Sequence, residues 1–401
     1  MKGINKPLLG GSLILLVTIN LFNLFNLIFN VSMARLLPLS DYGVLTTLIY
    51  FVVIFAVFSE SIQTVIAKYT SREDSKGKVK DIMIKSFKKA GFISIILYVV
   101  FLAAAIPLSI LMNIEYYLFA LIGITIITSF FIPVTRGVMQ GRKRFYSFGL
   151  NMILEGIVKL LIAISLVLLG WSLYGAVLGI VIGVFCALAF SFISLKEIIS
   201  EKRKKSETPK IYSYTKPVFI SMFSIVLFMS LDIILAKIYF SPEMVGAYAI
   251  SSTIAKIIFI GAQPISKAMF PFSSGAKREK DSKRAFTESI IFISVLILVF
   301  LAIMLIFPNI VIRLYAGRFI PESASILFYL SLAMGLLSLA NLTILYNLSL
   351  GKTKGYWKLL IFVALEVILL SLFNDTLLEF SFALITATVT FLWGSIVLLK
   401  E

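Results

Sequence analysis

Charged side chains interrupt several long apolar runs of the 401-residue sequence. Two of them are basic and four are acidic: Lys159, Lys256, Glu60, Glu155, Asp232 and Glu366. A charge in apolar surroundings is costly, so such groups pair with one another or face a polar cavity. Ammonium groups bind phosphate, and carboxylates hold cations or carry protons. These residues are therefore the first candidates for chemistry in the chain.

Glu155 and Lys159 stand four residues apart, which places them on one face of a helix. Either they form an ion pair that hides both charges, or Lys159 meets a substrate phosphate and Glu155 holds it when the site is empty. Lys256 has no acid three or four residues away. Its two interpretations are an ion pair with another helix, for example through Asp232, and a contact with phosphate or a sugar acid.

Four asparagines recur in the first apolar run at positions that share an arc of about 120° on a helix. They are Asn20, Asn23, Asn26 and Asn30. A polar stripe should not face lipid, so we expect it to point inward. There it either forms hydrogen bonds between helices or contacts a sugar, and both interpretations stay open.

The composition excludes whole classes of protein. Hydrophobic residues make up 60% of the chain and charged residues 14%, which is too few charges to cover a soluble surface. The sequence has no histidine and one cysteine, Cys186, so His-based metal sites, His-based catalysis and an intramolecular disulfide are excluded. We expect no metal and no cofactor. The net charge of +17 does not predict nucleic-acid binding, because the cations lie in short loops between apolar runs.

Twelve apolar runs are long enough to cross a ~30 Å hydrocarbon core as helices. They are 8–33, 42–66, 90–111, 116–138, 148–169, 173–195, 217–238, 246–270, 287–308, 323–348, 357–373 and 377–399. If all twelve span, 31 of the 37 Lys and Arg residues fall on one side and 4 on the other. The positive-inside rule then places both termini in the cytoplasm of a multi-pass cell-membrane protein, with basic loops facing anionic headgroups.

The longest polar interval, 196–216, lies midway along the chain and carries seven Lys and Arg residues. It predicts three parts: an N-terminal six-helix bundle over 1–195, a cytoplasmic linker over 196–216 and a C-terminal six-helix bundle over 217–401. The second half echoes the first. ARLLPLSDYG, at 34–43, is followed about 202 residues later by AKIYFSPEMVGAY, and Gly43 corresponds to Gly246. Six helices per half predict a pseudo-twofold axis along the membrane normal.

Several motifs together resemble a known family. They are ARLLPLSDYG, RGVMQGRKRF, LLGWSLYGAVLG and the spacing of Asp232, Lys237 and Gly246–Ala249. Their order and positions are similar to Wzx-type oligosaccharide flippases, polysaccharide biosynthesis proteins of the multidrug/oligosaccharidyl-lipid/polysaccharide (MOP) exporter superfamily. The resemblance implies an all-α membrane protein with two six-helix bundles in a V around a central cavity. It also implies a non-enzymatic transporter that moves a polyprenyl-linked glycan to the outer leaflet by alternating access.

With that resemblance, the basic and amide side chains become candidate substrate ligands. They are Arg35, Lys159, Lys256, Asn20, Asn23, Asn26 and Asn30, with Arg35 near the outer mouth. Glu60, Glu155, Asp232 and Glu366 are candidates for ion coupling or ion pairing. Two other functions remain open: a multidrug cation antiporter of the same superfamily, and a membrane glycan polymerase or ligase. The last would need catalytic groups on the outer face, where the predicted loops are short.

Overall fold

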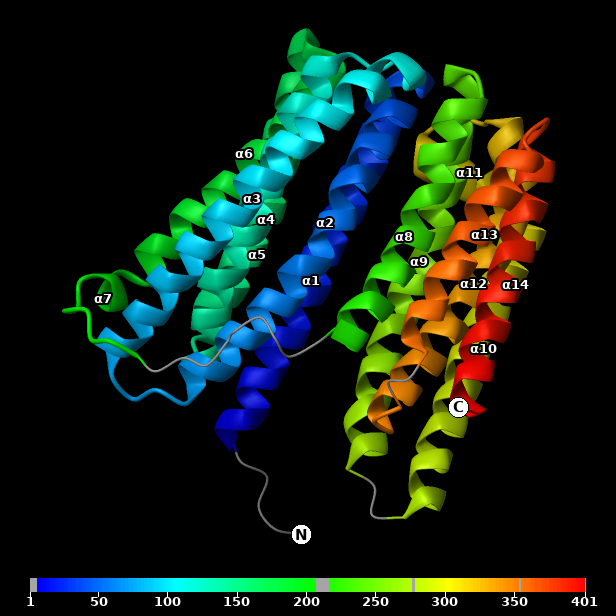
Figure 1. Ribbon diagram of the computed structural model, residues 1–401. Coiled ribbons are helices and arrows are strands. Elements are labelled where there is room, and N and C mark those ends of the chain that lie inside the picture. The colour runs from blue at the N-terminus through cyan, green and yellow to red at the C-terminus, as the bar shows by residue number, and fades with distance from the viewer. Residues whose placement is uncertain (1–5, 207–215, 276–277, 353–354, 401) are drawn as a thin grey trace. The chain divides into compact units, whose positions relative to one another are not determined.

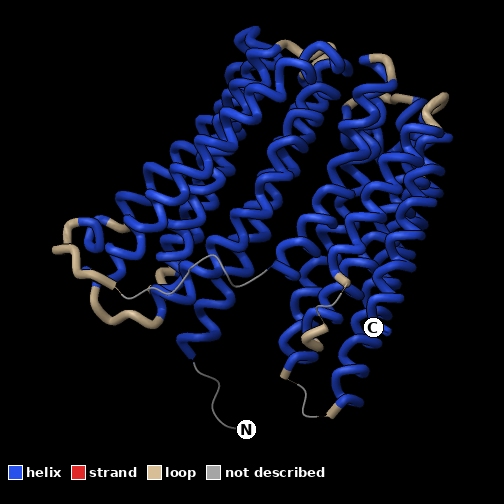
Figure 2. The backbone as a smooth tube through the Cα atoms, in the orientation of Figure 1, coloured by secondary structure: helices blue, strands red, loops and turns tan. Residues whose placement is uncertain are grey.

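The computed structural model describes residues 6–206, 216–275, 278–352 and 355–400, and every regular element within them is helical (Figure 2). Long helices follow from the sequence because apolar segments in lipid must satisfy their backbone hydrogen bonds internally. Each of the twelve predicted apolar runs lies largely within helices, although some runs reach one or two residues beyond a helix end. The predicted linker 196–216 lies partly outside the described residues.

The chain divides into two compact units. The first contains Met1–Leu37 and Phe55–Thr215, and the second contains Pro38–Ile54 and Lys216–Glu401. The helices of the first unit include α1 (Lys6–Leu36), the later part of α2 (Leu39–Ser71), α3 (Lys76–Met112), α4 (Tyr116–Gly141), α5 (Phe145–Leu166), α6 (Ser172–Ser194) and α7 (Lys196–Ile199). The three-part division predicted above stays a prediction. The structure adds that the first part of α2 packs with the second unit.

The second unit contains the remaining helices, which run side by side in Figure 1. They are α8 (Lys216–Tyr239), α9 (Pro242–Ser274), α10 (Glu279–Ile306), α11 (Pro308–Ala316), α12 (Pro321–Ser349), α13 (Leu359–Leu372) and α14 (Leu377–Lys400). Proline begins α9, α11 and α12. It suits the first helical position because its missing N–H has no partner there in any case.

Within the described residues, ten helical segments are long and apolar enough to cross a membrane. The number is lower than twelve for two reasons. Helices α5 and α6 join through a π-turn, η1 (Val167–Trp171), and count as one segment, Phe145–Ser194. Helix α13 has 14 residues and follows a short 3-10 turn, η2 (Tyr356–Lys358). The expected all-α membrane class is confirmed.

The hairpin of α5 and α6 depends on glycine at two places. The chain reverses at Gly170, whose φ of 91° favours a residue without a side chain. Farther along α6, a Cβ on Gly183 would lie 2.8 Å from the Cβ of Lys159, so the two helices pack closely. This contact fixes the position from which the Lys159 side chain leaves α5.

Candidate functional site

Lys159 and Asn26 meet inside the first unit. The Lys159 ammonium on α5 donates a hydrogen bond to Oδ1 of Asn26 on α1. It also lies 4.7 Å from the centre of the Phe29 ring, one helical turn farther along α1. Both Lys159 and Asn26 are half-buried. The structure thus brings two predicted site residues together. The face of the Phe29 ring attracts the Lys159 ammonium and helps to hold it in place.

Within the described part of the chain, the other three asparagines of the stripe form no hydrogen bond with Lys159. Asn20 donates to its own helix at Leu16 O, 2.8 Å away, and Asn30 donates to Asn26 O at 2.9 Å. Asn20 and Asn23 are exposed, whereas Asn30 is half-buried. Their contact with substrate stays a prediction.

Glu155 forms its ion pair with Arg136 of α4, not with Lys159. Arg136 Nη2 lies 2.5 Å from Glu155 Oε2, and its Nε donates to Asn151 Oδ1 at 2.8 Å. The Asn151 amide in turn donates to the carbonyl of Ala187 on α6, 2.6 Å away. The Glu155–Lys159 ion pair, one of the two interpretations of this spacing, is therefore not the bond that Glu155 forms here. The cause is that a neighbouring helix brings a better-placed cation than the next turn of α5 does.

Arg136 was not among the predicted site residues, because it stands at the end of the apolar run 116–138, close to the cations Arg142, Lys143 and Arg144. In the structure it lies inside α4, five residues before the helix ends at Gly141. The available signal was Glu155 itself, since a carboxylate inside an apolar run needs a cation on one of its neighbours.

Lys256 and Asp232 form a buried ion pair in the second unit. Lys256 Nζ on α9 lies 2.9 Å from Asp232 Oδ1 on α8, and the two residues are 1% and 0% exposed. The other oxygen, Oδ2, accepts hydrogen bonds from Ser252 at 2.8 Å and Tyr248 at 3.2 Å. The ammonium also lies 3.8 Å from the centre of the Tyr50 ring of α2. This is the interhelical interpretation of Lys256, and the ammonium would reach a substrate only by leaving Asp232.

Three further predicted residues, Glu366, Arg35 and Glu60, lie on α13, α1 and α2. Glu366, on α13, is fully buried, and neither of its carboxylate oxygens has a hydrogen-bond partner among the described residues. Arg35, in the last turn of α1, is exposed, and so is Glu60 on α2. The roles proposed for all three stay predictions.

A third cluster attaches the beginning of the predicted linker to α3. Asp81 of α3 is 1% exposed and accepts hydrogen bonds from Arg203 Nε at 2.6 Å and from the Ser206 N–H and hydroxyl, each at 2.9 Å. Lys85 completes the ring of donors at 2.7 Å. We call residues 196–206 the anchored segment. Nothing in the sequence distinguished Asp81 from the other charges of that basic region.

The anchored segment has further contacts with the first unit. Lys204 donates its backbone N–H to the carbonyl of Gly77 at 3.1 Å. Glu197 lies 3.1 Å from Lys76 and 2.9 Å from Arg144. These two cations lower the pKa of the exposed Glu197 carboxyl. The segment is therefore attached through both backbone and side-chain bonds.

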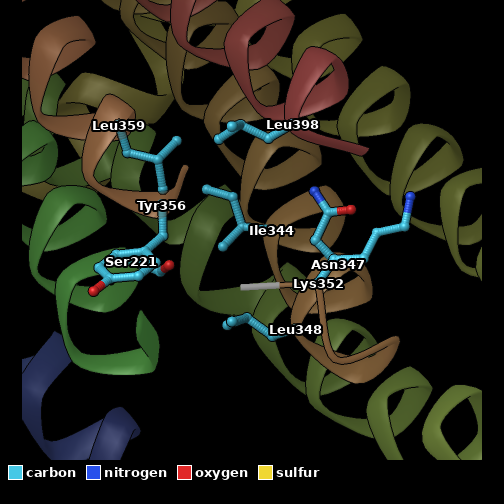
Figure 3. Close-up of a pocket in the computed structure, with 8 residues that line it drawn as sticks. All are labelled: Ser221, Ile344, Asn347, Leu348, Lys352, Tyr356, Leu359 and Leu398. Atoms are coloured by element: carbon cyan, nitrogen blue, oxygen red, sulfur yellow. The ribbon is translucent and has the colours of Figure 1, made fainter. Parts of the chain in front are cut away.

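A small pocket lies in the second unit where α12 ends (Figure 3). Its lining residues are Ser221, Ile344, Asn347, Leu348, Lys352, Tyr356, Leu359 and Leu398. Asn347 donates to Ser395 O at 3.2 Å, and its own oxygen has no recorded partner among the described residues. None of the predicted site residues lines this pocket.

A family model described as polysaccharide biosynthesis protein matches residues 32–325, which is most of the chain. The chain belongs to this family. The resemblance inferred from the motifs is therefore confirmed at the level of the family. The matched range includes Lys159, Arg136, Asp232 and Lys256, and it ends before Glu366.

Individual proteins are also similar to this chain over most of its length. An uncharacterized membrane protein of Methanocaldococcus jannaschii is 25% identical over 359 residues, covering 84% of this chain and 83% of the relative. A multidrug resistance MATE family transporter of the MOP superfamily, in its inward-facing conformation, is similar with a TM-score of 0.75 and 15% identity. That match covers 94% of this chain and 95% of the other.

A third match is a MOP superfamily transporter from Pyrococcus furiosus, with a TM-score of 0.65 and 16% identity over 99% of this chain and 96% of that one. Its binding pocket is described as having reversed polarity that suggests a different function. These likenesses show the MOP transporter fold for this member of the polysaccharide biosynthesis family.

Proposed function

We propose that this protein flips a polyprenyl-(pyro)phosphate-linked oligosaccharide from the cytoplasmic to the outer leaflet. The observation that carries the proposal is the Lys159–Asn26–Phe29 group of the first unit. An ammonium that is half-buried in a predicted span is costly unless it pairs with an anion or faces a polar cavity. Its recorded hydrogen-bond partner is a neutral amide, so the positive charge stays available to an anion.

The chemistry of this group suits a glycan lipid. The ammonium would bind the phosphate that joins sugar to polyprenol, and the amide and ring would contact the sugar. The same helix, α1, would offer further sugar contacts through Asn20, Asn23 and Asn30. Arg35, in its last turn, would bind the phosphate near the outer mouth of the cavity. In this proposal Lys256 stays paired with Asp232, so Lys159 is the lysine that binds the phosphate.

Alternating access would use the two halves of the chain as two six-helix bundles with a pseudo-twofold axis along the membrane normal and a V-shaped cavity. Support comes from the internal echo and from the MOP fold. Both termini and the linker would lie in the cytoplasm, as the uneven distribution of Lys and Arg predicts. Cysteine labelling from either side of the membrane tests this orientation.

A second candidate is a multidrug cation antiporter, because a multidrug resistance transporter has a similar fold with a TM-score of 0.75. The two functions require opposite charge at the substrate site. A cation exporter needs a free carboxylate, whereas Glu155 is paired with Arg136 and Lys159 contributes a positive charge. The charge around Lys159 therefore favours an anionic substrate.

The test is transport in proteoliposomes. A fluorescent polyprenyl-pyrophosphate disaccharide is incorporated, and a membrane-impermeant quencher reports the fraction in the outer leaflet. We expect faster exchange between leaflets with the protein than in empty vesicles, and ethidium uptake no faster than in empty vesicles. Native mass spectrometry of the purified protein should detect a bound lipid-linked sugar. Ethidium transport without glycan-lipid exchange would replace the proposal by the antiporter.

A further inference from the structure

The second unit buries three ionisable side chains from three helices in one place: Asp232 of α8, Lys256 of α9 and Glu366 of α13. All three are 1% exposed or less. Asp232 and Lys256 are bonded to each other, and the charges of both act on Glu366 through space. If every group were ionised, the cluster would hold two negative charges and one positive charge away from water.

The two carboxylates have opposite surroundings. Asp232 accepts three hydrogen bonds, from Lys256, Ser252 and Tyr248, which stabilise its ionised form. Glu366 accepts none among the described residues, although both of its oxygens are buried. An ionised carboxylate without donors is strongly disfavoured in such a setting, and a proton removes the charge. The environments therefore separate the two acids into one ionised and one neutral group.

No other described charge is placed to balance Glu366. Asp232 faces it from α8, and Lys256 and Tyr248 act from α9. Helix α14 also packs on α13. Among its residues with described side chains, the charged one is Glu379 in the first turn, which is an acid and cannot balance Glu366. On the other side of Lys256, α2 contributes the Tyr50 ring. The balance is thus decided within the three residues.

We propose that Asp232, Lys256 and Glu366 form a proton-binding site in which Glu366 binds the proton and Lys256 takes the place of a metal cation. Without Lys256, two neighbouring buried carboxylates would need either a second proton or a monovalent cation such as Na⁺ to balance their charge. The Lys256 ammonium, covered by Asp232 and the Tyr50 ring, supplies that charge from the chain itself. A cation site of this kind needs no metal and responds to protons.

The first test uses thermal unfolding of the purified protein in detergent, with NaCl compared with choline chloride at equal ionic strength. The wild-type Tm should be the same in both salts. Lys256→Met removes the tethered cation, so its Tm should rise with Na⁺ by about 5 °C near saturation. Lys256→Met combined with Glu366→Gln should lose that response. A wild-type Tm that rises specifically with Na⁺, or a Lys256→Met variant indifferent to Na⁺, would overturn the proposal.

A second measurement does not depend on Lys256→Met folding. Infrared spectroscopy of the wild type at neutral pH should show the carbonyl stretch of a protonated carboxylic acid, and Glu366→Gln should remove that band. Glu366→Gln mimics the neutral acid, so its Tm at neutral pH should match the wild type. If the band persists in Glu366→Gln, or is absent from the wild type, Glu366 is not the proton carrier.

The use of this site in transport rests on the proposed function, and the two can fail separately. In the glycan-lipid assay, a pH gradient should change the wild-type exchange rate, whereas Glu366→Gln should exchange without responding to the gradient. Exchange that responds equally in both would reject the role of Glu366 and leave the flippase intact. Absence of exchange in the wild type would reject the flippase, while the spectroscopic test of the site would still stand.

Discussion

Gly43 on α2 and Gly246 on α9, the two glycines of the internal echo, pack backbone against backbone within the second unit. A Cβ on Gly43 would lie 2.8 Å from the Gly246 nitrogen. A Cβ on Gly246 would lie 2.0 Å from the carbonyl oxygen of Leu39, a distance that requires the backbone to move. The first part of α2 belongs to this unit because the two helices approach closely here.

Gly246→Ala should therefore destabilise the protein by about 1–3 kcal/mol or more, as overpacked sites do. Gly261→Ala on the same helix is the matched control, since its Cβ would meet only Leu296 Cδ2 at 3.8 Å. Thermal unfolding in detergent should show a lower Tm for Gly246→Ala and an equal or higher Tm for Gly261→Ala. Equal losses in the two variants would contradict the contact.

The asparagine stripe predicts water on one face of α1. In a Cys186→Ala background, Asn20→Cys and Asn23→Cys should react with a water-soluble maleimide. Leu21→Cys and Leu24→Cys should not, although Leu24 is 48% exposed, because these positions lie off the stripe and we expect them to face lipid. Membrane vesicles provide the assay, and similar labelling of all four variants would argue against a water-facing stripe.

Breaking the Arg136–Glu155 pair should cost more than breaking a pair at the surface. Glu155→Ala leaves an arginine side chain that is 12% exposed without its carboxylate, and about 3 kcal/mol of stability should be lost. Arg136→Met combined with Glu155→Leu should recover much of it, because no lone charge remains. Glu288→Ala, which breaks the exposed pair with Arg284, is the control and should leave the stability almost unchanged. The readout is Tm, and a double variant no better than Glu155→Ala would be the contrary result.

Lys159 should matter to transport through its charge. Lys159→Ala should reduce glycan-lipid exchange by roughly tenfold or more, the worth of a hydrogen bond to a charged group. Lys159→Arg should keep part of the rate, since it retains the charge but changes the geometry. The exposed Lys88→Ala is the control, and protein levels should be near normal in all three. Unchanged exchange in Lys159→Ala would remove Lys159 from the substrate site.

The anchored segment should detach when Asp81 loses its charge. Asp81→Asn weakens the bonds to Arg203, Lys85 and Ser206, so trypsin should cleave after Arg203 faster than in the wild type. Mass spectrometry of the fragments gives the cleavage site. Glu279→Gln, which breaks the exposed pair with Lys283, serves as control and should leave this cleavage rate unchanged. An Asp81→Asn rate equal to that of the wild type would show that Asp81 does not hold the segment.

The sequence alone determined the helices, because each apolar run must satisfy its backbone within itself in lipid. It also identified the family through ARLLPLSDYG and the other motifs, and it selected the charged residues inside the runs. Even the pair of Lys256 with Asp232 was among its two interpretations.

Only the tertiary structure decided which faces meet. In the structure Glu155 pairs with Arg136, and Asn26 accepts a hydrogen bond from Lys159. Glu366 has no hydrogen-bond partner among the described residues, because Lys256 is already paired with Asp232. Helical periodicity relates residues three or four positions apart, so it predicts neighbours on the same helix. Contacts between helices depend instead on close approach at small residues, such as Gly183 against Lys159 and Gly43 against Gly246. These approaches join segments far apart in the chain, and no local pattern in the sequence records which segments meet.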